Sequence, residues 1–269
     1  MSKLSVIMCV YISDDADALS TAIESILEQT VGCDLLIYQD GPVSDELRSV
    51  LSYYTINYNV KLFESKDNCG LAFGLNYLIS YSLEQGYEFI ARMDSDDISY
   101  PDRMNRQLVF LNNNKMVDVL GTSCREFGAS FALKEKHLPV SHEKLVDFSI
   151  ARCPFIHPSV MFRASVFEQG CRYPENTTLT EDMALWFQLL SEGVTFANLN
   201  EVLLDYRLNE NTINRRKGVY KALSEIRIRI KYMINLKRVN ARNILLIGSR
   251  IVFHLMPSLF LKFAYKNLR

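Results

Sequence analysis

Short apolar runs alternate with amphipathic segments through the first third of the chain, and this alternation constrains the fold most. Apolar runs of strand length occupy residues 4–11, 35–38, 60–63 and 89–93. Between the first two runs, apolar side chains recur at helical spacing: Leu19, Ala22, Ile23, Ile26 and Leu27. Such a rhythm is typical of a mostly parallel sheet with helices on both faces. We therefore predict an α/β fold.

Helix boundaries can be predicted from capping residues. We expect Asp17 to cap the first helix and Ser44 to cap the second. Residues 71–84 should form the third helix, and Pro101 suits the first turn of the fourth. After about residue 115 the pattern is less regular, although residues 117–120 resemble another strand.

Polar residues follow three of the predicted strands at the point where each strand ends. These polar segments are residues 39–41, 67–70 and 94–97. Because ligands of parallel sheets bind beyond the carboxyl ends of the strands, we expect the three segments to share one rim. The sequence therefore predicts a ligand site at this rim.

The third polar segment places three carboxylates in four positions: Asp94, Asp96 and Asp97. Like charges at this spacing repel one another, and folding alone does not require them. Hard oxygen ligands suit Mg²⁺ or Mn²⁺, which often also binds the oxygens of a diphosphate. The alternative is that these acids are helix caps and solvated loop residues.

A second acidic pair, Glu181 and Asp182, precedes an apolar helical segment that contains Trp186. An aspartate at a cleft can act as a general base toward an attacking hydroxyl. The alternative is that both acids serve only the N-terminus of their helix. A metal site followed by a base is the combination that transfer from a diphosphate donor requires.

Eight motifs in order resemble family 2 inverting glycosyltransferases of the GT-A (Rossmann-like) fold. They are VIMCVY (6–11), QDG (39–41), NCGLA (68–72), RMDSDDI (92–98), PDR (101–103), HPS (157–159), EDMALW (181–186) and YR (206–207). The resemblance runs from about residue 4 to about residue 210. It implies a glycosyltransferase domain over residues 1–213 that acts in bacterial surface-polysaccharide biosynthesis of the O-antigen or capsule type.

The resemblance also implies a set of residues that bind the nucleotide-sugar. These are Val10, Tyr11, Asp40, Asn68, Gly70, Arg92, Asp94, Ser95 and Asp96. Asp40 would bind the uracil, and Arg92 would reach the donor phosphates. Asp94, Asp96 and Asp97 would hold the metal, with their roles not apportioned. As alternatives, Asp40 is a turn residue, Gly70 is a flexible turn and Arg92 pairs with local acids.

On the acceptor side, the resemblance assigns Asp182 as the catalytic base. Glu181, Trp186 and His157 are the implied acceptor-binding residues, with His157 also near the donor sugar or diphosphate. Trp186 would form a wall of the acceptor site. The alternative for Trp186 is that it is an aromatic residue of the core. The alternative for His157 is that it is a core histidine with its hydrogen bonds satisfied. Asn209 stands where many relatives have a histidine near the metal, which favours a carboxylate-and-water shell.

The reaction implied is a single in-line displacement that needs Mn²⁺ or Mg²⁺ and a UDP-sugar donor. A hexose (galactose, glucose or an N-acetylhexosamine) would pass to a hydroxyl of a lipid-linked saccharide, with inversion to a β-glycoside. The rival hypothesis is a catalytically silent nucleotide-binding or membrane scaffold on the same fold.

The C-terminal residues 214–269 are strongly basic. They hold 14 Lys and Arg and one acid, Glu225, whereas the rest of the chain holds 16 basic and 30 acidic residues. We predict an amphipathic helical tail on an anionic membrane surface. The alternative is a helical layer that packs on the body or forms a dimer.

The cysteine pattern indicates where the protein is located, and the absence of a recognisable nucleic-acid-binding motif argues against a nucleic-acid partner. The six cysteines show no paired spacing, which favours reduced thiols in a cytoplasmic protein. We therefore expect the chain to lie on the inner face of the cell membrane. No nucleic-acid-binding module is present in the sequence, so a nucleic-acid partner is not expected.

Overall fold

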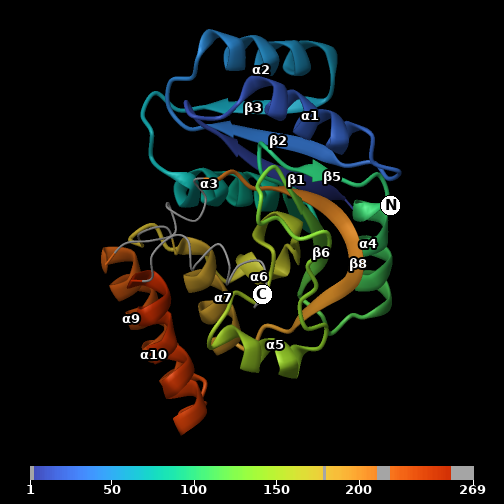
Figure 1. Ribbon diagram of the computed structural model, residues 1–269. Coiled ribbons are helices and arrows are strands. Elements are labelled where there is room, and N and C mark those ends of the chain that lie inside the picture. The colour runs from blue at the N-terminus through green and yellow to red at the C-terminus, as the bar shows by residue number, and fades with distance from the viewer. Residues whose placement is uncertain (1–2, 178–179, 211–218, 256–269) are drawn as a thin grey trace.

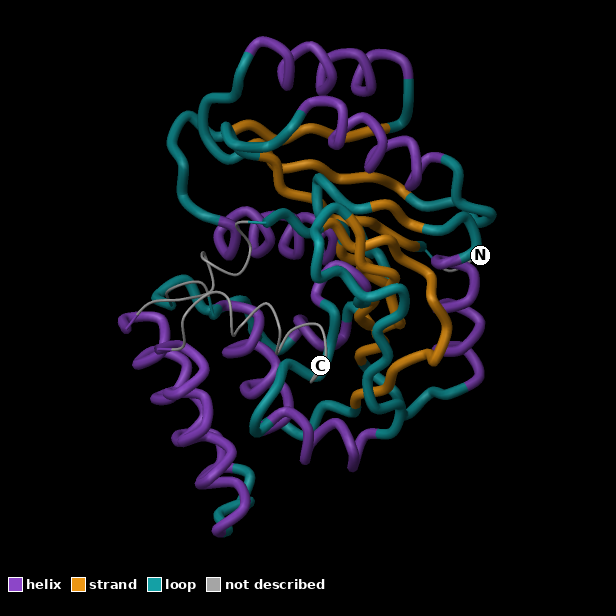
Figure 2. The backbone as a smooth tube through the Cα atoms, in the orientation of Figure 1, coloured by secondary structure: helices purple, strands orange, loops and turns teal. Residues whose placement is uncertain are grey.

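The computed structural model describes residues 3–177, 180–210 and 219–255. Its centre is one eight-stranded sheet in the order β3-β2-β1-β4-β7-β6-β8-β5, drawn in orange in Figure 2. The strands are β1 (Leu4–Val10), β2 (Asp34–Gln39), β3 (Val60–Glu64), β4 (Phe89–Arg92), β5 (Ile98–Ser99), β6 (Val119–Phe127), β7 (Met161–Arg163) and β8 (Phe196–Arg207).

The sheet is parallel in one half and mixed in the other. Strands β3, β2, β1 and β4 pair in parallel, as the sequence predicts. The pairs β4·β7, β6·β7 and β5·β8 are antiparallel, and β6·β8 is parallel. The prediction of a mostly parallel sheet thus holds for the first half. It misses the second half because the strand–helix alternation ends there.

Helices cover both faces of the sheet, which confirms the predicted layering. The helices are α1 (Ala16–Leu27), α2 (Asp45–Asn57), α3 (Leu71–Glu84), α4 (Arg103–Asn113), α5 (His142–Ser149), α6 (Ser165–Glu168), α7 (Glu181–Ser191), α9 (Val219–Asn235) and α10 (Ala241–Leu255), with a 3₁₀ turn at His157–Ser159. Figure 1 shows α1 and α2 on one side of the first strands and α3 on the other. Alternation along β1 explains this, since Val6 and Met8 join one core cluster and Ile7 joins the other.

Three helix starts can be compared with the predictions. The cap of α1 is Asp15, whose side chain accepts from the Ala18 N–H at 2.9 Å, while Asp17 lies inside the first turn. Ser44 caps α2 as predicted, accepting from the Leu47 N–H. Pro101 lies in the turn just before α4. The Asp17 prediction was wrong because Asp15 and Asp17 are both plausible caps and only the backbone geometry selects one.

The long strand β8 returns the chain to the acidic loop. It runs beside β6 and ends against β5, where Ile98 pairs with Asp205. Because β5 directly follows the acidic residues 94–97, the end of β8 lies beside them. The candidate site is therefore closed by a segment more than a hundred residues further along the chain.

The C-terminal helices α9 and α10 pack on the body. Phe187 of α7 stacks on Tyr232 of α9, with ring centroids 5.1 Å apart. Met183 and Phe187 share a buried apolar cluster with Met233 of α9 and Ile247 of α10. The α9–α10 hairpin is thus joined to the body by an apolar core of its own.

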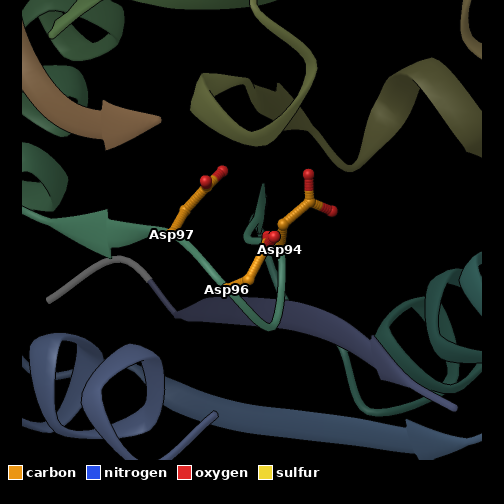
Figure 3. Close-up of side chains that lie close together, drawn as sticks. All are labelled: Asp94, Asp96 and Asp97. Atoms are coloured by element: carbon orange, nitrogen blue, oxygen red, sulfur yellow. The ribbon is translucent and has the colours of Figure 1, made fainter. Parts of the chain in front are cut away.

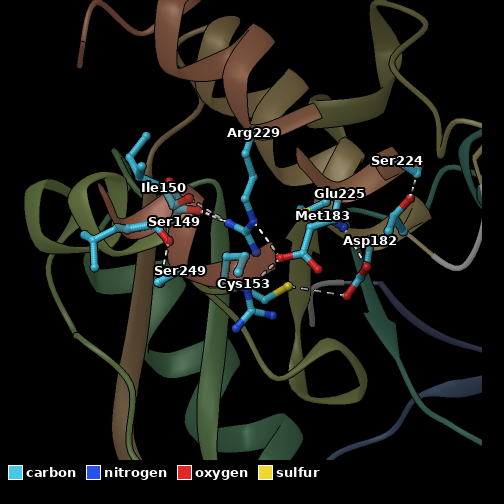
Figure 4. Close-up of polar contacts among 12 residues, drawn as sticks. Ser149, Ile150, Cys153, Asp182, Met183, Ser224, Glu225, Arg229 and Ser249 are labelled. Carbon is cyan, nitrogen blue, oxygen red and sulfur yellow. Dashed lines mark hydrogen bonds and ion pairs between the residues drawn. The ribbon is translucent and has the colours of Figure 1, made fainter. Parts of the chain in front are cut away.

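A buried ionic network lies inside this hairpin (Figure 4). Glu225 accepts from Arg229 Nε at 2.8 Å and from Arg250 Nε at 2.9 Å. Arg229, which is 2% exposed, also donates to the carbonyl oxygens of Ser149 and Ile150 at the end of α5. The only acid of the basic C-terminal region therefore binds the two helices together and to the body.

For residues 219–255, the packed layer is the alternative that agrees with the structure, rather than a tail separate from the body. The predicted domain boundary at 213/214 and the apolar residues after 255 lie outside the described residues. Within the described ranges, no helix has the length and apolarity needed to cross a bilayer. All six cysteines fall in these ranges and are free thiols.

We predict that Glu225→Ala strongly destabilises the fold. Removing the carboxylate leaves the buried Arg229 and the partly buried Arg250 without their shared acid. Loss of one partner from a buried ion pair lowers the free energy of unfolding by about 3–5 kcal/mol. Urea unfolding at constant pH measures this. The control is Glu201→Ala, which breaks the exposed ion pair with Arg106 and should leave the midpoint near that of the wild type. Equal midpoints for the two variants would contradict the stabilising role of the network.

Candidate active site

The carboxylate of Asp40 fastens the loop after β3 to the end of β2. Its two oxygens accept from the Cys69 N–H at 2.6 Å and the Gly70 N–H at 2.9 Å. The Asn68 side chain donates to the Asp40 carbonyl at 3.2 Å. Gly41 approaches so closely, with φ at +83°, that a Cβ there would lie 2.9 Å from Asn68 N. The first two polar strand endings therefore meet, as the predicted topology requires.

The loop after β1 joins the acidic loop through a residue that the sequence analysis did not single out. One Asp14 oxygen accepts from the Tyr11 N–H at 3.0 Å and from the Ser95 hydroxyl at 2.9 Å. Val10 is buried, whereas Tyr11 is exposed. Asp14 thus brings two of the predicted nucleotide-binding residues, Tyr11 and Ser95, to the same place. Its acidic neighbours Asp94 and Asp96 are distant in sequence, so no local signal marks it.

The three acids after β4 converge on one space (Figure 3). One oxygen each from Asp94, Asp96 and Asp97 lie within 4.8 Å of one another. Asp97 is fully buried: its Oδ1 accepts from the Arg207 N–H at 2.7 Å, and its Oδ2 has no partner among the described residues. An unpaired buried carboxylate oxygen is costly, and a divalent cation would satisfy it. The donor set therefore fits Mg²⁺ or Mn²⁺.

Burial and nearby like charges raise the pKa values of Asp96, Asp97 and the neighbouring Asp14. The pKa of Asp96 rises to about 6, first because of burial and then because of the charges of Asp94 and Asp14. Burial likewise raises the pKa of Asp14 to about 6. The pKa of Asp97 rises well above its ordinary value, again from burial first and then from Asp94 and Asp96. The cluster thus holds more negative charge than its surroundings stabilise.

Two arginines oppose the acids from different strands. Arg92 of β4 forms an ion pair with Asp94, and Arg207 of β8 donates from Nε to the Asp96 carbonyl at 2.7 Å. Arg92 is 2% exposed, and its Nε and Nη1 have no partner within the described residues. Burial opposes its charge, but Asp94 raises the pKa of Arg92 overall. The alternative of pairing with a local acid is therefore present, and two of its nitrogens are buried without a partner among the described residues.

Asp182 lies in the first turn of α7, partly exposed. Its Oδ1 accepts from the Met183 N–H at 2.7 Å, and Cys153 Sγ lies 3.9 Å from its Oδ2 as a donor. Glu181 is also partly exposed at the start of the same helix. Both acids thus favour the helix N-terminus, as the alternative states, and the Asp182 carboxylate is also held by a contact from another segment.

Trp186 does not line an open site, so its predicted place in an acceptor wall is wrong for this structure. It is fully buried, stacked on Phe162 at 5.8 Å and edge-on to Phe155 at 5.0 Å. The helix α7 turns its apolar face toward the sheet, and Trp186 follows that face. The core-aromatic alternative is therefore correct.

His157 forms an internal pair. Its Nε2 lies 2.8 Å from the Tyr173 hydroxyl, and its ring lies edge-on to Trp186 at 5.7 Å. Burial first, and then the charge of Arg92, lower the pKa of His157 well below its ordinary value, so it is neutral. Its hydrogen bond is satisfied within the fold, as the core-histidine alternative describes. The charge of Arg92, which pairs with Asp94 of the acidic loop, also acts on it.

The Glycosyl transferase family 2 model matches residues 5–170, which include the acidic loop and the loop that Asp40 fastens. The chain belongs to this family. An *Escherichia coli* relative named UDP-Gal:alpha-D-GlcNAc-diphosphoundecaprenol beta-1,3-galactosyltransferase is 33% identical, over 99% of this chain and 96% of its own. The Amylovoran biosynthesis glycosyltransferase AmsE of *Erwinia amylovora* is 29% identical, over 98% of each chain.

Solved structures agree with the GT-A fold of this family 2 glycosyltransferase. *S. aureus* TarS 1–349 in complex with UDP-GlcNAc superposes with a TM-score of 0.70 at 16% identity, over 94% of this chain and 72% of that one. The Pyrobaculum calidifontis mannosyltransferase PcManGT in complex with GDP-Man and Mn²⁺ superposes with a TM-score of 0.61 at 13% identity. The superposition covers 98% of this chain and 84% of that one. The predicted fold and enzyme class are confirmed.

We predict that Mn²⁺ raises the melting temperature more at pH 7.5 than at pH 5. The folded pKa values of Asp96 and Asp14, about 6, lie above the ordinary 3.8, so the metal-free fold loses stability as pH rises from about 4 to about 6 and stays less stable above that. Below pH 6 they hold protons that a cation must displace. Thermal unfolding with and without MnCl₂ at both pH values measures this. Asp96→Asn should reduce the increment, and equal increments at both pH values would contradict the assignment.

Proposed function

We propose that the chain is a metal-dependent, inverting hexosyltransferase that uses a UDP-sugar and acts on a hydroxyl of a lipid-linked saccharide. The observation that carries this is the convergence of Asp94, Asp96 and Asp97 after β4, with one oxygen of each within 4.8 Å of the others. One oxygen of the buried Asp97 has no partner among the described residues, so a cation that also binds a diphosphate would complete the cluster.

On the donor side, this chain's residues bind and orient the nucleotide-sugar. Asp94, Asp96 and Asp97 would hold the cation, and the chemistry that the cation supplies is neutralisation of the departing diphosphate. The unpaired Nε and Nη1 of Arg92 are buried donors of the kind that bind phosphate oxygens. These contacts make a separate general acid unnecessary.

The nucleoside portion is proposed to bind at the rim formed by the first two strand endings. The loop that Asp40 fastens carries Asn68 and Gly70, and Tyr11 and Ser95 meet at Asp14. The Asp40 carboxylate accepts two backbone N–H groups and retains lone pairs for a base N–H. Its proposed contact with uracil is thus compatible with its role in holding the loop.

On the acceptor side, Asp182 is proposed to remove the proton of the attacking hydroxyl. The backbone N–H of Met183 binds one of its carboxylate oxygens in the first turn of α7. Attack in line with the departing diphosphate inverts the anomeric centre, so an α-linked donor yields a β-glycoside. Glu181, beside the base, is the remaining proposed acceptor contact.

The relatives guide the choice of substrates. UDP-galactose is the first donor to test, because the *E. coli* relative is named for it and for a diphosphoundecaprenol-linked acceptor. The relative named for amylovoran biosynthesis supports a role in surface-polysaccharide assembly. The silent-scaffold hypothesis remains the rival, and retention of Asp182 with the three acids favours catalysis. Transfer of radiolabelled sugar from a panel of UDP-sugars to lipid-linked GlcNAc diphosphate tests the proposal.

We predict that Asp182→Asn lowers kcat by about 10²–10⁴-fold, the range that a general base contributes, while donor affinity stays near that of the wild type. Sugar transfer and UDP-sugar titration measure the two quantities. Asp45→Asn, an exposed acid on α2, is the control and should keep full activity. Equal turnover by Asp182→Asn and the wild type would remove the base assignment, and a product with retained configuration would remove the inverting mechanism.

We further propose that the outer face of the α9–α10 hairpin lies on the inner, anionic surface of the cell membrane. The exposed residues of this hairpin include both cations and large apolar side chains: Arg227, Lys231, Lys237, Arg242, Leu223, Ile230, Ile234, Ile244 and Leu245. Such a mixture suits the headgroup region, where basic groups meet anionic lipids and apolar groups enter the acyl boundary.

We predict that Arg227→Glu with Lys231→Glu reduces binding to phosphatidylglycerol vesicles by about tenfold or more, since each basic residue near an anionic surface contributes about 1 kcal/mol. Co-sedimentation measures binding, and phosphatidylcholine vesicles show the charge-independent part. The control pair is Arg48→Glu with Lys115→Glu, two exposed cations outside the hairpin. If both double variants sediment with the vesicles alike, the hairpin is not the membrane surface.

A further inference from the structure

The first turn of α7, which carries Asp182, is held from outside by the C-terminal hairpin. The Thr180 and Ser224 hydroxyls lie 3.3 Å apart, which joins the start of α7 to α9. Met183, the residue after Asp182, belongs to the apolar cluster that Met233 and Ile247 of the hairpin complete. Figure 4 shows Asp182 and Met183 beside these helices. The position of this turn therefore depends on contacts that the hairpin supplies.

The Asp182 carboxylate is oriented by one donor on each oxygen. The Met183 N–H binds Oδ1 at 2.7 Å, and the Cys153 thiol faces Oδ2 at 3.9 Å, within the longer reach of sulfur. Burial raises the pKa of Cys153 to about 12, with a further increase from the charge of Asp182. Cys153 is therefore a neutral thiol at pH 7, able to donate its proton in a hydrogen bond. A carboxylate accepts about four hydrogen bonds, so capacity remains for an acceptor hydroxyl.

Cys153 is in turn held by the segment that the buried ionic network fixes. Arg229 donates to the Ser149 carbonyl at 2.8 Å and to the Ile150 carbonyl at 2.9 Å, a few residues before Cys153. The charges of Arg229, Glu225 and Arg250 all act on the thiol's pKa. Cys153 also packs against the apolar cluster of the hairpin. The thiol is thus the point where the network meets the carboxylate.

We propose that Cys153 is a positioning residue for Asp182, and that the Glu225 network of the α9–α10 hairpin holds it in place. This rests on the proposed function, in which Asp182 is the base. The S–H donor selects one orientation of the carboxylate, with its remaining lone pairs toward the acceptor.

The test compares Cys153→Ala with Cys153→Ser in the full chain. Loss of the donor should lower kcat about fivefold, within the range of a single net hydrogen bond, with an unchanged KM for the UDP-sugar. Serine, which restores an O–H donor, should recover at least half of the lost rate. The control is Cys33→Ala, which removes a thiol contact of similar length, 3.8 Å to the Ile26 carbonyl, outside the site.

The pH profile separates positioning from packing. Without the thiol donor, the low-pH limb of kcat/KM should move to higher pH in Cys153→Ala and return in Cys153→Ser. The charged and titratable groups that act on the pair from each neighbouring element stay the same in all variants: Glu181, Tyr173, Glu225, Arg229 and Arg250. The shift can therefore be attributed to the lost donor.

Several results would overturn the proposal. Wild-type kcat and an unmoved limb in Cys153→Ala would show that the thiol does not position the base. A rate loss that serine does not recover, with a lowered melting temperature, would assign Cys153 to packing alone. An active Asp182→Asn variant would remove the base itself, and with it the proposed function's mechanism. A slow Cys153→Ala variant together with an inactive Asp182→Asn variant would support both the proposed base and its positioning by Cys153.

Discussion

The repulsion among three carboxylates at the end of β4 is the constraint on which the rest of the site depends. Asp94 is paired with Arg92 from the same strand, and Asp97 is bound by the backbone of Arg207 from the end of β8. The acidic loop therefore reaches this arrangement only when the complete sheet has formed. Because one Asp97 oxygen still has no partner in the described part of the chain, the fold leaves a defined need for positive charge.

The side-chain amide of Asn76 joins helix α3 to the segment that precedes the proposed base. Asn76 of α3 accepts from the Tyr173 N–H at 2.8 Å and donates to its carbonyl at 2.9 Å. This side chain takes both backbone groups of Tyr173, as a neighbouring strand would. The Tyr173 hydroxyl then lies 2.8 Å from His157 Nε2. The helix α3, which starts at the loop that Asp40 fastens, thus fixes the segment that leads to the proposed base.

The features that were predicted correctly depend on local pattern. Strand β3 was expected at residues 60–63 and is Val60–Glu64, because alternation and flanking turns are visible in any short window. That residues 39–41 and 67–70 would share one rim followed from the strand order that these local patterns indicate, whereas the bonds from Cys69 and Gly70 to Asp40 are seen only in the structure. Asp14 was missed, because its partner Ser95 becomes a neighbour only in the folded sheet.

Trp186 shows where a family resemblance can mislead. The resemblance assigned this residue, four positions after Asp182, to a wall of the acceptor site. In the structure the short Asp182 side chain turns back to bind the Met183 N–H, at the helix start. The long indole instead enters a core built by Phe155, Phe162 and Phe196 from three other segments. No local sequence pattern reveals that core.

The C-terminal hairpin unites the two proposals about where and how the enzyme acts. Its inner face holds the turn that carries Asp182, through Thr180 and Met183. Its outer face presents cations and apolar side chains together. A lipid-linked acceptor has its reactive sugar a short diphosphate away from the bilayer, so its hydroxyl must be met close to the membrane surface. One element that contacts lipid on one side and positions the base on the other meets this geometric requirement without a separate acceptor domain.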